Sequence, residues 1–302
     1  MFEESPVMLY YALTPVHMGA GDGLGVVDAP IQRDVVTGYP VMYGSGIKGA
    51  LRHGLGATDR LGEEKMTLLF GPSSDKSSEH AGALSFTDAH IVLFPVKALD
   101  KGFVYVTSPY ALMRLARSIE MSGGDASWSL PKPSNGDAYL VGGQAEEKKQ
   151  EKVYLEYFEF DSSISEELST VAHWIADNVD PFDSEGYFHK KILEDIVLLS
   201  EENFRFFVSN HTSVEPHVKI DDETGTADGG ALFYVENLPP ETVMAGNLLV
   251  SKSRKKDSSR SAQDLLNDFK EALDNLKLVQ FGGDATYGRG LMQVSLVIEE
   301  TL

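Results

Sequence analysis

A glycine turn opens a helical pattern that carries two cations, a combination that can hold a phosphate group. Gly44, Ser45 and Gly46 precede apolar residues that recur every four positions, which predicts a helix with Ser45 as its N-cap. Lys48 and Arg52 lie one helical turn apart beside that apolar stripe. The free N–H groups and positive end of a helix attract phosphate. Taken alone, however, the turn is better explained as an ordinary cap followed by a solvated face.

A second glycine cluster near the other end of the chain favours the phosphate interpretation. The segment GGDATYGRG contains Gly282, Gly283 and Arg289, and it precedes the alternating, strand-like run LMQVSLVIEE. A glycine-dense loop lets a backbone approach a ligand that side chains would otherwise keep away. Two such loops, one near each end of the chain, predict a shared ligand-binding face.

Asp28 stands in the motif VVDAP, directly after a glycine-rich stretch, and it has two interpretations. It is either a functional carboxylate in a flexible loop or the first residue of an Asx turn before Pro30. The residues alone favour the turn.

Two long segments of the chain carry a family resemblance, LTPVHMGAGDGLGVVDAPIQRDVVTGYPVMYGSGIKGALR and, far downstream, GGDATYGRGLM. They resemble the RAMP superfamily of CRISPR-associated RNA-binding proteins. Within the family, GVVDAPIQR with TGYPV, and IDDETGTADGGALFYVENLPPET, are most similar to the repeated backbone subunit of the type III-B (Cmr) effector complex. Residues 122–178 carry no matching motif. The resemblance implies a subunit that polymerises along a CRISPR guide RNA and cleaves complementary single-stranded target RNA at regular intervals, with Asp28 as the cutting residue. The alternative is a structural RNA-binding subunit of the same complex that does not cut.

A carboxylate can promote RNA cleavage in two ways. As a general base it takes the proton of a ribose 2′-hydroxyl, which attacks the adjacent phosphorus; an ordinary carboxylate is a weak base at neutral pH. As a metal ligand it holds a divalent cation near the phosphate oxygens. We therefore expect Asp28 to bind Mg²⁺ or another divalent cation weakly, because a single carboxylate leaves most ligands to water and substrate.

Three further residues are predicted to assist Asp28, namely His17, Tyr234 and Glu236. His17 is a candidate acid or base, and the alternative is a hydrogen-bonded structural histidine. Tyr234 and Glu236 are candidates for orienting the substrate, and simple packing is the alternative for Tyr234. The residues predicted to contact the RNA backbone are Gly44, Ser45, Gly46, Lys48, Arg52, Lys219, Gly282, Gly283 and Arg289.

The net charge of −20 opposes RNA binding, because proteins that bind a polyanion alone are usually basic. We expect a local solution, in which one groove gathers the cations while the acidic residues lie elsewhere. The cations expected in that groove, beyond those named above, are Arg33, the run 252–256 and Arg260.

Composition excludes several other classes of protein. The absence of cysteine removes disulfides, thiolate metal sites and cysteine nucleophiles. No apolar run is long enough to span a bilayer and no signal peptide is recognisable, which predicts a cytoplasmic protein without membrane contact. The segment GSGIKG lacks the GxxxxGK[ST] spacing of a nucleotide-binding loop, so a small-molecule phosphate enzyme is disfavoured.

Periodicity predicts an α+β protein. Expected strands cover 7–13, 83–96, 103–107 and 152–160, and expected helices cover 63–70, 166–178, 190–207 and 258–276, with further helices starting at 45 and 109. The resemblance implies a ferredoxin-like, RRM-like βαββαβ palm in a single RAMP domain over 1–302. The pattern of the middle elements indicates helical insertions at about 122–207. The resemblance also implies a protruding hairpin thumb at about 215–238, and as partners guide RNA, target RNA, further copies of the chain and other Cmr subunits.

Overall fold

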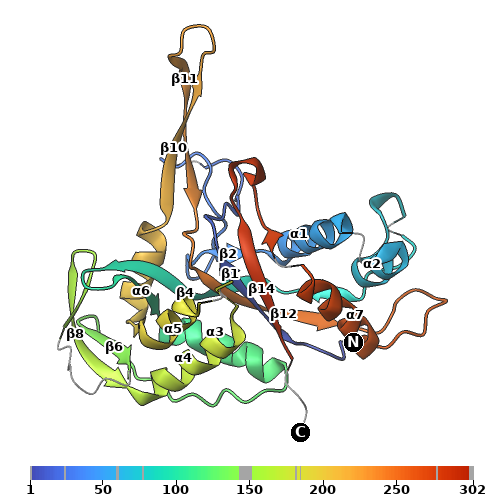
Figure 1. Ribbon diagram of the computed structural model, residues 1–302, viewed down its shortest axis with the longest axis horizontal. Coiled ribbons are helices and arrows are strands. Elements are labelled where there is room, and N and C mark those ends of the chain that lie inside the picture. Colours follow the sequence, from blue (N-terminus) through green and yellow to red (C-terminus); the bar gives the residue numbers. More distant parts are fainter. Residues whose placement is uncertain are drawn as a thin grey trace.

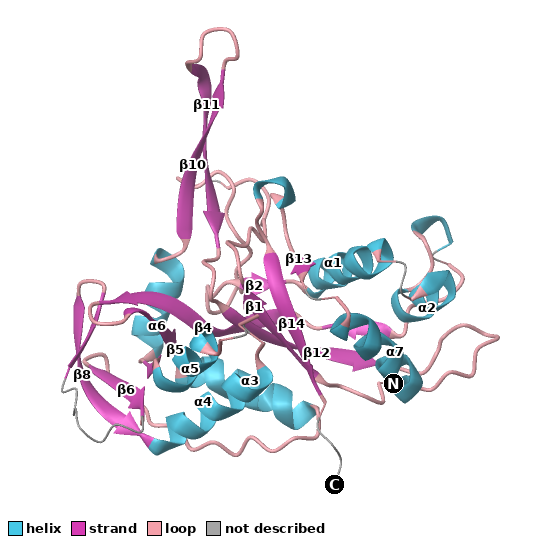
Figure 2. Cartoon of the chain, viewed as in Figure 1, coloured by secondary structure: helices cyan, strands magenta, loops and turns pink. Residues whose placement is uncertain are grey.

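A single large sheet, covered by helices on both faces, forms the body of the protein in a computed structural model (Figures 1 and 2). The structure describes residues 2–23, 25–58, 61–76, 78–142, 152–180, 182–183, 185–276 and 278–298. Within this part of the chain the sheet has 12 strands. Ten of them follow one another in the order β13 (Val279–Gln280), β14 (Leu291–Val297), β1 (Val7–Ala12), β12 (Val243–Val250), β4 (Ala89–Ala98), β5 (Gly102–Thr107), β9 (Ile196–Leu198), β6 (Asp137–Val141), β8 (Phe158–Ser165) and β7 (Lys152–Leu155).

Short pairings complete the sheet. β2 (Val41–Met42) pairs with β4, and β3 (Leu84–Phe86) pairs with β12. Ala98, at the end of β4, also pairs with Leu155 of β7, so this half of the sheet curls back on itself. The fold is therefore α+β, as the periodicity predicts.

Strand β1 is buried on both faces, which explains its uninterrupted apolar sequence VMLYYA. It lies between β12 and β14 and is antiparallel to both. Met8 and Tyr10 point into one core, whereas Leu9 and Tyr11 point into the other. The alternation of side chains along a strand produces this division.

The helices divide between the two faces in the same way. α1 (Gly44–Ala57), α2 (Gly62–Phe70), α6 (Glu201–Asn210) and α7 (Ala262–Asp274) contribute to the core of Met8 and Tyr10. α3 (Pro109–Met121), α4 (Glu166–Asn178) and α5 (Tyr187–Glu194) contribute to the core of Leu9 and Tyr11. Two short 3₁₀ helices, η1 (Ser74–Lys76) and η2 (Ala285–Tyr287), lie in loops. None of the described helices has the length and apolar character needed to cross a membrane.

Two strands form a separate hairpin that projects far from the body (Figure 1). β10 (Ser213–Ile220) pairs antiparallel with β11 (Ala227–Asn237), and Val218 faces Leu232. The turn between them is fixed by Asp221, whose carboxylate accepts hydrogen bonds from the Thr224 N–H at 2.7 Å and its hydroxyl at 2.9 Å. This hairpin occupies the range expected for the thumb.

The middle of the chain differs from the sequence expectation in two places. The expected helix over 190–207 is wrong: α5 ends at Glu194, β9 follows, and α6 restarts with Ser200 accepting a hydrogen bond from the Asn203 N–H. β9 is an Ile-Val-Leu run that inserts between β5 and β6. The expected strand over 152–160 is a hairpin of β7 and β8, turning at Glu156 with φ 53°. Residues 143–151, 181 and 184 of the expected insertion lie outside the described residues.

Glu241 provides a pH-dependent contribution to stability. Its carboxylate contacts the Tyr11 hydroxyl in the core, and burial raises the pKa of Glu241 to about 7. A raised pKa means that the folded state holds a proton more tightly than the unfolded state, so this stabilisation is complete below about pH 4.5 and is lost as the pH rises through 7. We expect Glu241→Gln to gain stability relative to the wild type over that interval, measured by urea unfolding between pH 4 and 9. Glu120→Gln, at an exposed position of α3, is the control. A pH-independent difference for Glu241→Gln would refute the assignment.

Candidate functional site

The loop from His17 to Ile31 is hydrogen-bonded to the edge of β11 that does not pair with β10, which we call the free edge. Along this edge the Tyr234 N–H donates to Asp28 Oδ2 at 2.7 Å and the Tyr234 carbonyl accepts from Ala29 N at 3.0 Å. The Glu236 N–H then donates to the Ala29 carbonyl at 3.0 Å, and the Glu236 carbonyl bonds His17 Nδ1 at 2.7 Å. Alternate residues of a strand present both polar groups to the same edge. Asp28 and His17 are therefore fixed about two residues, roughly 7 Å, apart along one strand.

Asp28 is exposed and only partly engaged. Oδ2 accepts the Tyr234 N–H, and Oδ1 has no protein partner in the described part of the chain. An Asx turn would need an N–H two residues on, and Pro30 has none. The Asx-turn interpretation is therefore wrong, and the structure presents one carboxylate oxygen to the solvent.

The glycine-rich loop before Asp28 is closed tightly. The Gly23 N–H donates to the Asp28 carbonyl at 2.7 Å, and a Cβ at Gly23 would lie 2.2 Å from the Val27 carbonyl oxygen. A side chain at this position would force the loop open. The glycine thus allows the turn that places Asp28 at the base of the hairpin.

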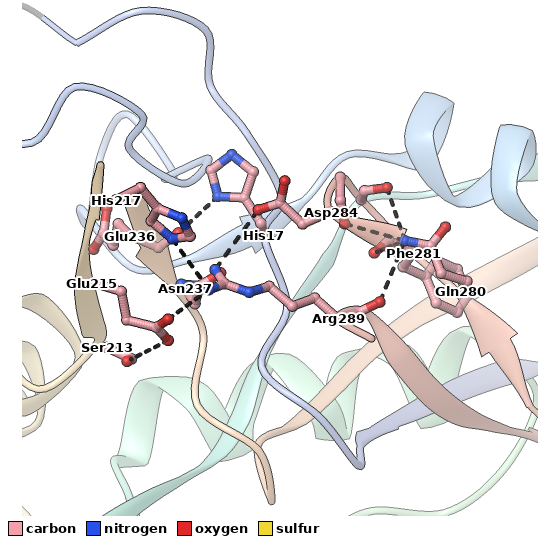
Figure 3. Close-up of polar contacts among 12 residues, drawn as sticks. His17, Ser213, Glu215, His217, Glu236, Asn237, Gln280, Phe281, Asp284 and Arg289 are labelled. Atoms are coloured by element: carbon pink, nitrogen blue, oxygen red, sulfur yellow. Dashed lines mark hydrogen bonds and ion pairs between the residues drawn. The ribbon is translucent and has the colours of Figure 1, made fainter. Parts of the chain in front are cut away.

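His17 combines a fixed nitrogen with an open one. Because Nδ1 bonds a carbonyl oxygen, it carries the proton, and Nε2 of the neutral ring is left with a lone pair. Nε2 faces the start of the glycine loop, since a Cβ at Gly19 would lie 3.0 Å from it. The side chain is half-buried between this loop and the hairpin (Figure 3). His17 therefore makes a structural hydrogen bond and also presents a proton acceptor.

Glu236 points into the protein, and the expectation that its carboxylate orients substrate is wrong. It is only 6% exposed and accepts hydrogen bonds from Ile31 N at 3.0 Å, Thr212 Oγ1 at 2.7 Å and Arg33 at 2.5 Å. Arg33 also donates to the carbonyls of Gly38 and Val208, so its expected place in an RNA groove is wrong as well. These residues position the loop, and Tyr234 positions Asp28 through its backbone.

The C-terminal glycine loop packs directly on His17. The Gly283 N–H donates to the His17 carbonyl at 2.9 Å. Gly282 has φ +77°, and a Cβ there would lie 2.1 Å from the same carbonyl oxygen. Both glycines are exposed on their other side. The structure therefore places this loop against the start of the glycine-rich segment that precedes Asp28, and the ligand-binding face predicted to be shared with the Gly44 turn stays a prediction.

Arg289 joins this loop to the hairpin instead of facing a ligand. It is 7% exposed, and its guanidinium donates to Glu215 Oε2 at 2.5 Å and Asn237 Oδ1 at 2.6 Å, with Asp284 Oδ2 at 3.7 Å (Figure 3). The prediction that Arg289 contacts RNA is wrong, because its donors are engaged inside the protein.

The start of α1 differs in detail from the prediction. Tyr43 is the N-cap, not Ser45, and the Gly44 N–H donates to Asp88 Oδ1 at 2.8 Å. Gly44 is buried, and a Cβ there would lie 2.2 Å from the Phe86 carbonyl oxygen, so it does not face a ligand. Ser45 and Gly46 are exposed, and Gly46 has open space where a side chain would be.

A cluster of three cations lies beside α1. Burial lowers the pKa of Lys48, and the nearby guanidiniums of Arg52 and Arg254 lower it further. In the described residues none of the three forms an ion pair with a carboxylate. We call these three residues the cation cluster. Such uncompensated positive charge is unusual in a protein with a net charge of −20 and is suited to a phosphate backbone.

The cations do not form the single groove that was expected. Arg260 pairs with Asp268 at 2.7 Å, and Lys219 lies exposed on the hairpin. Gln32 connects the Asp28 loop to α1: its amide donates to the Gly19 carbonyl at 3.1 Å, and its oxygen accepts the Tyr43 N–H at 3.1 Å. The start of α1 and the catalytic candidate thus belong to one connected region.

Among the described residues, no three acidic or histidine side chains lie close enough together to hold a metal ion. Asp28 alone therefore fits only a hydrated ion that takes its remaining ligands from water and substrate.

Several contributors were not predicted from the sequence. Arg254 was expected only as a member of the basic run 252–256, and the structure places it in the cation cluster. Asp88, Thr212 and Asn237 hold the site from positions far away in the chain. The density of basic residues around Arg254 was the one available signal, since the other three are common loop and strand residues.

Comparisons with known proteins identify relatives of the chain and of its fold. Residues 10–293 match the model of the RAMP superfamily. A protein of Pyrococcus furiosus (strain ATCC 43587 / DSM 3638 / JCM 8422 / Vc1), named CRISPR system Cmr endoribonuclease Cmr4, is 34% identical over 287 residues, which are 95% of this chain and 93% of that protein. A crystal structure of oligomeric Cmr4 from Pyrococcus furiosus superimposes with a TM-score of 0.74 and 27% identity, over 98% of this chain and 100% of that one. A cryo-EM structure of the type III-B Cmr-beta complex bound to cognate target RNA contains a chain with a TM-score of 0.74 and 18% identity, matched over 98% of both chains.

Arg289→Met tests whether this residue is structural. Removing the buried guanidinium, whose ion-pair partner Glu215 is partly exposed, is expected to lower the free energy of unfolding by about 2 kcal/mol, measured by urea denaturation. Arg289→Lys is expected to restore only part of this loss, because an ammonium cannot reproduce the fork that reaches Glu215 and Asn237 together. If Arg289→Met left stability unchanged but weakened RNA binding, the result would support the original prediction that Arg289 contacts RNA.

Proposed function

The chain belongs to the RAMP superfamily, and from this membership and the site geometry we propose that it is the RNA-guided endoribonuclease subunit of a type III-B CRISPR effector complex. One observation carries the proposal: Asp28 and His17 are held side by side on the free edge of β11, and each keeps one atom open to a ligand. The relative at 34% identity is named an endoribonuclease, which supports the same activity for this chain.

The strand order supports a ferredoxin-like palm. Strands β14, β1, β12 and β4 are neighbours in that order and are antiparallel. With α1 following β1 and α7 following β12, they form a βαββαβ unit whose last strand lies beside its first. We interpret the elements between β4 and β12 as an insertion that includes residues 122–207, and the β10–β11 hairpin as the thumb of a single domain over 1–302.

We propose that the subunit works as a polymer along a guide RNA. A solved relative at 27% identity is described as oligomeric, which supports assembly with further copies. Base pairing supplies sequence specificity, so the protein needs only backbone contacts, for which the cation cluster, Ser45, Gly46 and the 282–283 loop are placed. A chain with a net charge of −20 binds RNA weakly alone, and copies in register join their positive surfaces into one track. Target RNA and other Cmr subunits complete the partners.

The proposed reaction is transesterification within the target strand. The ribose 2′-oxygen attacks the adjacent phosphorus as its O–H bond breaks, and the P–O5′ bond breaks. The leaving 5′-oxygen takes a proton from water, so the products are a 2′,3′-cyclic phosphate and a 5′-hydroxyl. His17 Nε2 is the acceptor available for the 2′-hydroxyl proton, because Nδ1 is already protonated by its bond to the Glu236 carbonyl. In-line attack requires a nucleotide to leave helical geometry, and we propose that the thumb displaces it from the guide–target duplex.

Asp28 Oδ1 is the oxygen available to a divalent cation such as Mg²⁺, with Oδ2 held by the Tyr234 N–H. A bound cation would offset negative charge on the phosphate oxygens. The Tyr234 N–H fixes the direction of the carboxylate whether or not an ion is bound. The alternative function, a structural subunit that does not cut, would leave Asp28 without a catalytic role.

Asp28→Asn is expected to reduce target cleavage about 100-fold or more in the assembled complex, because the amide lacks the negative charge that holds a cation or stabilises a proton acceptor. Guide and target binding should persist. The measurement is gel analysis of end-labelled target, with Asp22→Asn in the same loop as the control.

The same assay with EDTA, followed by added Mg²⁺, separates a metal-binding role of Asp28 from a role in proton transfer. If Asp28 binds a cation, chelation should stop cleavage by the wild type and magnesium should restore it. Unchanged cleavage by Asp28→Asn would favour the structural subunit.

Lys48→Ala is expected to weaken guide binding and to make it less dependent on salt. For single-stranded RNA, each phosphate contact contributes about 0.7 to the slope of log affinity against log salt concentration. The slope should therefore fall by about that amount, measured by fluorescence anisotropy at several salt concentrations. Lys190→Ala on α5, which packs on the opposite face of the sheet, is the control. An equal slope in the Lys48 and Lys190 variants would remove α1 from the RNA surface.

A further inference from the structure

Three aromatic rings stack in a column at the base of the hairpin. The rings of His217 and Phe233 lie 5.3 Å apart at 19°, and the rings of His217 and Tyr287 lie 6.0 Å apart at 27°. They come from β10, β11 and η2, so the column spans the contact between the hairpin and the C-terminal glycine loop. Most other ring pairs in the described chain meet edge to face, as at Tyr10 and Phe281. Unlike an edge-to-face pair, a column of nearly parallel rings leaves a flat ring face at each end.

The column is held in place without a ligand. The Tyr287 N–H donates to the Asp284 carbonyl at 2.9 Å, which closes the turn that carries the ring. His217 Nε2 lies 3.4 Å from the guanidinium of buried Arg289, which is itself fixed by Glu215 and Asn237 (Figure 3). A ligand that stacks here would therefore not have to order the rings first.

The two outer rings are exposed. Tyr287 is 68% exposed and Phe233 is 44% exposed, while His217 lies between them. The column also adjoins both candidate catalytic residues. Phe233 directly precedes Tyr234, whose N–H holds Asp28, and Tyr287 belongs to the loop whose Gly283 N–H bonds the His17 carbonyl.

We propose that Tyr287 receives a nucleobase of the target strand, which stacks on its exposed face as the fourth ring of the column. This inference rests on the proposed function, since it places the base next to the linkage that Asp28 and His17 act on. Flat aromatic faces bind bases without sequence preference, because every base presents a π-face. A base held on Tyr287 leaves the guide–target stack, so its ribose can turn toward the in-line geometry that cleavage needs.

The test uses the complete complex carrying Asp28→Asn, guide RNA, and target strands with 2-aminopurine at successive positions. Stacking quenches the fluorescence of this base analogue. We expect one position in each cleavage interval to be more quenched than its neighbours. Tyr287→Leu should abolish that extra quenching, and Tyr287→Phe should retain it. In complexes with Asp28 intact, Tyr287→Leu should slow cleavage about 5- to 100-fold, which corresponds to the loss of one base–aromatic stack.

Tyr157→Leu provides the matched control, because Tyr157 is 97% exposed at the β7–β8 turn, outside the site. Circular dichroism melting of Tyr287→Leu and Tyr287→Phe checks that both fold. The inference is overturned if Tyr287→Leu leaves both quenching and cleavage at wild-type levels. It is also overturned if Tyr287→Leu reduces only the size of the assembly, which would make the column a contact between copies. Failure of the complex to bind target at all would instead reject the proposed function.

Discussion

The free edge of β11 is the constraint on which the site depends. Four consecutive backbone groups of Tyr234 and Glu236 must find partners, and the loop containing Asp28, Ala29 and His17 supplies all of them. An unpaired strand edge is both costly and prone to wrong pairing. Here its satisfaction fixes a carboxylate and an imidazole at a set spacing. The catalytic candidates are thus positioned by backbone hydrogen bonding, and this explains how a flexible glycine-rich loop can present a defined geometry.

Buried charge supports this edge from below. The Glu236 carboxylate accepts hydrogen bonds from Arg33, Thr212 and the Ile31 N–H. The Arg289 guanidinium donates to Glu215 and Asn237 and lies near Asp284. Each ion pair connects segments far apart in sequence. Because both pairs are turned inward, the positive charge available for the proposed RNA contact lies in the cation cluster beside α1. The overall charge of −20 is therefore compatible with a locally positive surface.

Much of this organisation was predictable from local patterns. The apolar run of β1, the stripe of α1 and the hairpin are visible in the sequence. The Asx turn that the residues favoured for Asp28 was wrong, because its carboxylate accepts the Tyr234 N–H from a strand far away in the chain. The roles of Arg289, Arg33 and Glu236 were not predictable, because an arginine in a glycine loop looks alike whether it faces a phosphate or a buried carboxylate. Ser45 was a good cap by type, yet Asp88 binds the Gly44 N–H from another strand. The Ile196–Leu198 strand was missed because a short apolar run between two helical patterns fits either structure.

The attachment of the Asp28 loop to the hairpin has a mechanical consequence. The arm of β10 and β11 projects well beyond the body, and its inner end is the same stretch of β11 that holds Asp28 and His17 (Figure 1). The arm therefore joins the body at Tyr234 to Glu236, the stretch of β11 that is bonded to the Asp28 loop. Under the proposed function, a duplex that displaced the tip would therefore also move the stretch of β11 to which Asp28 and His17 are hydrogen-bonded.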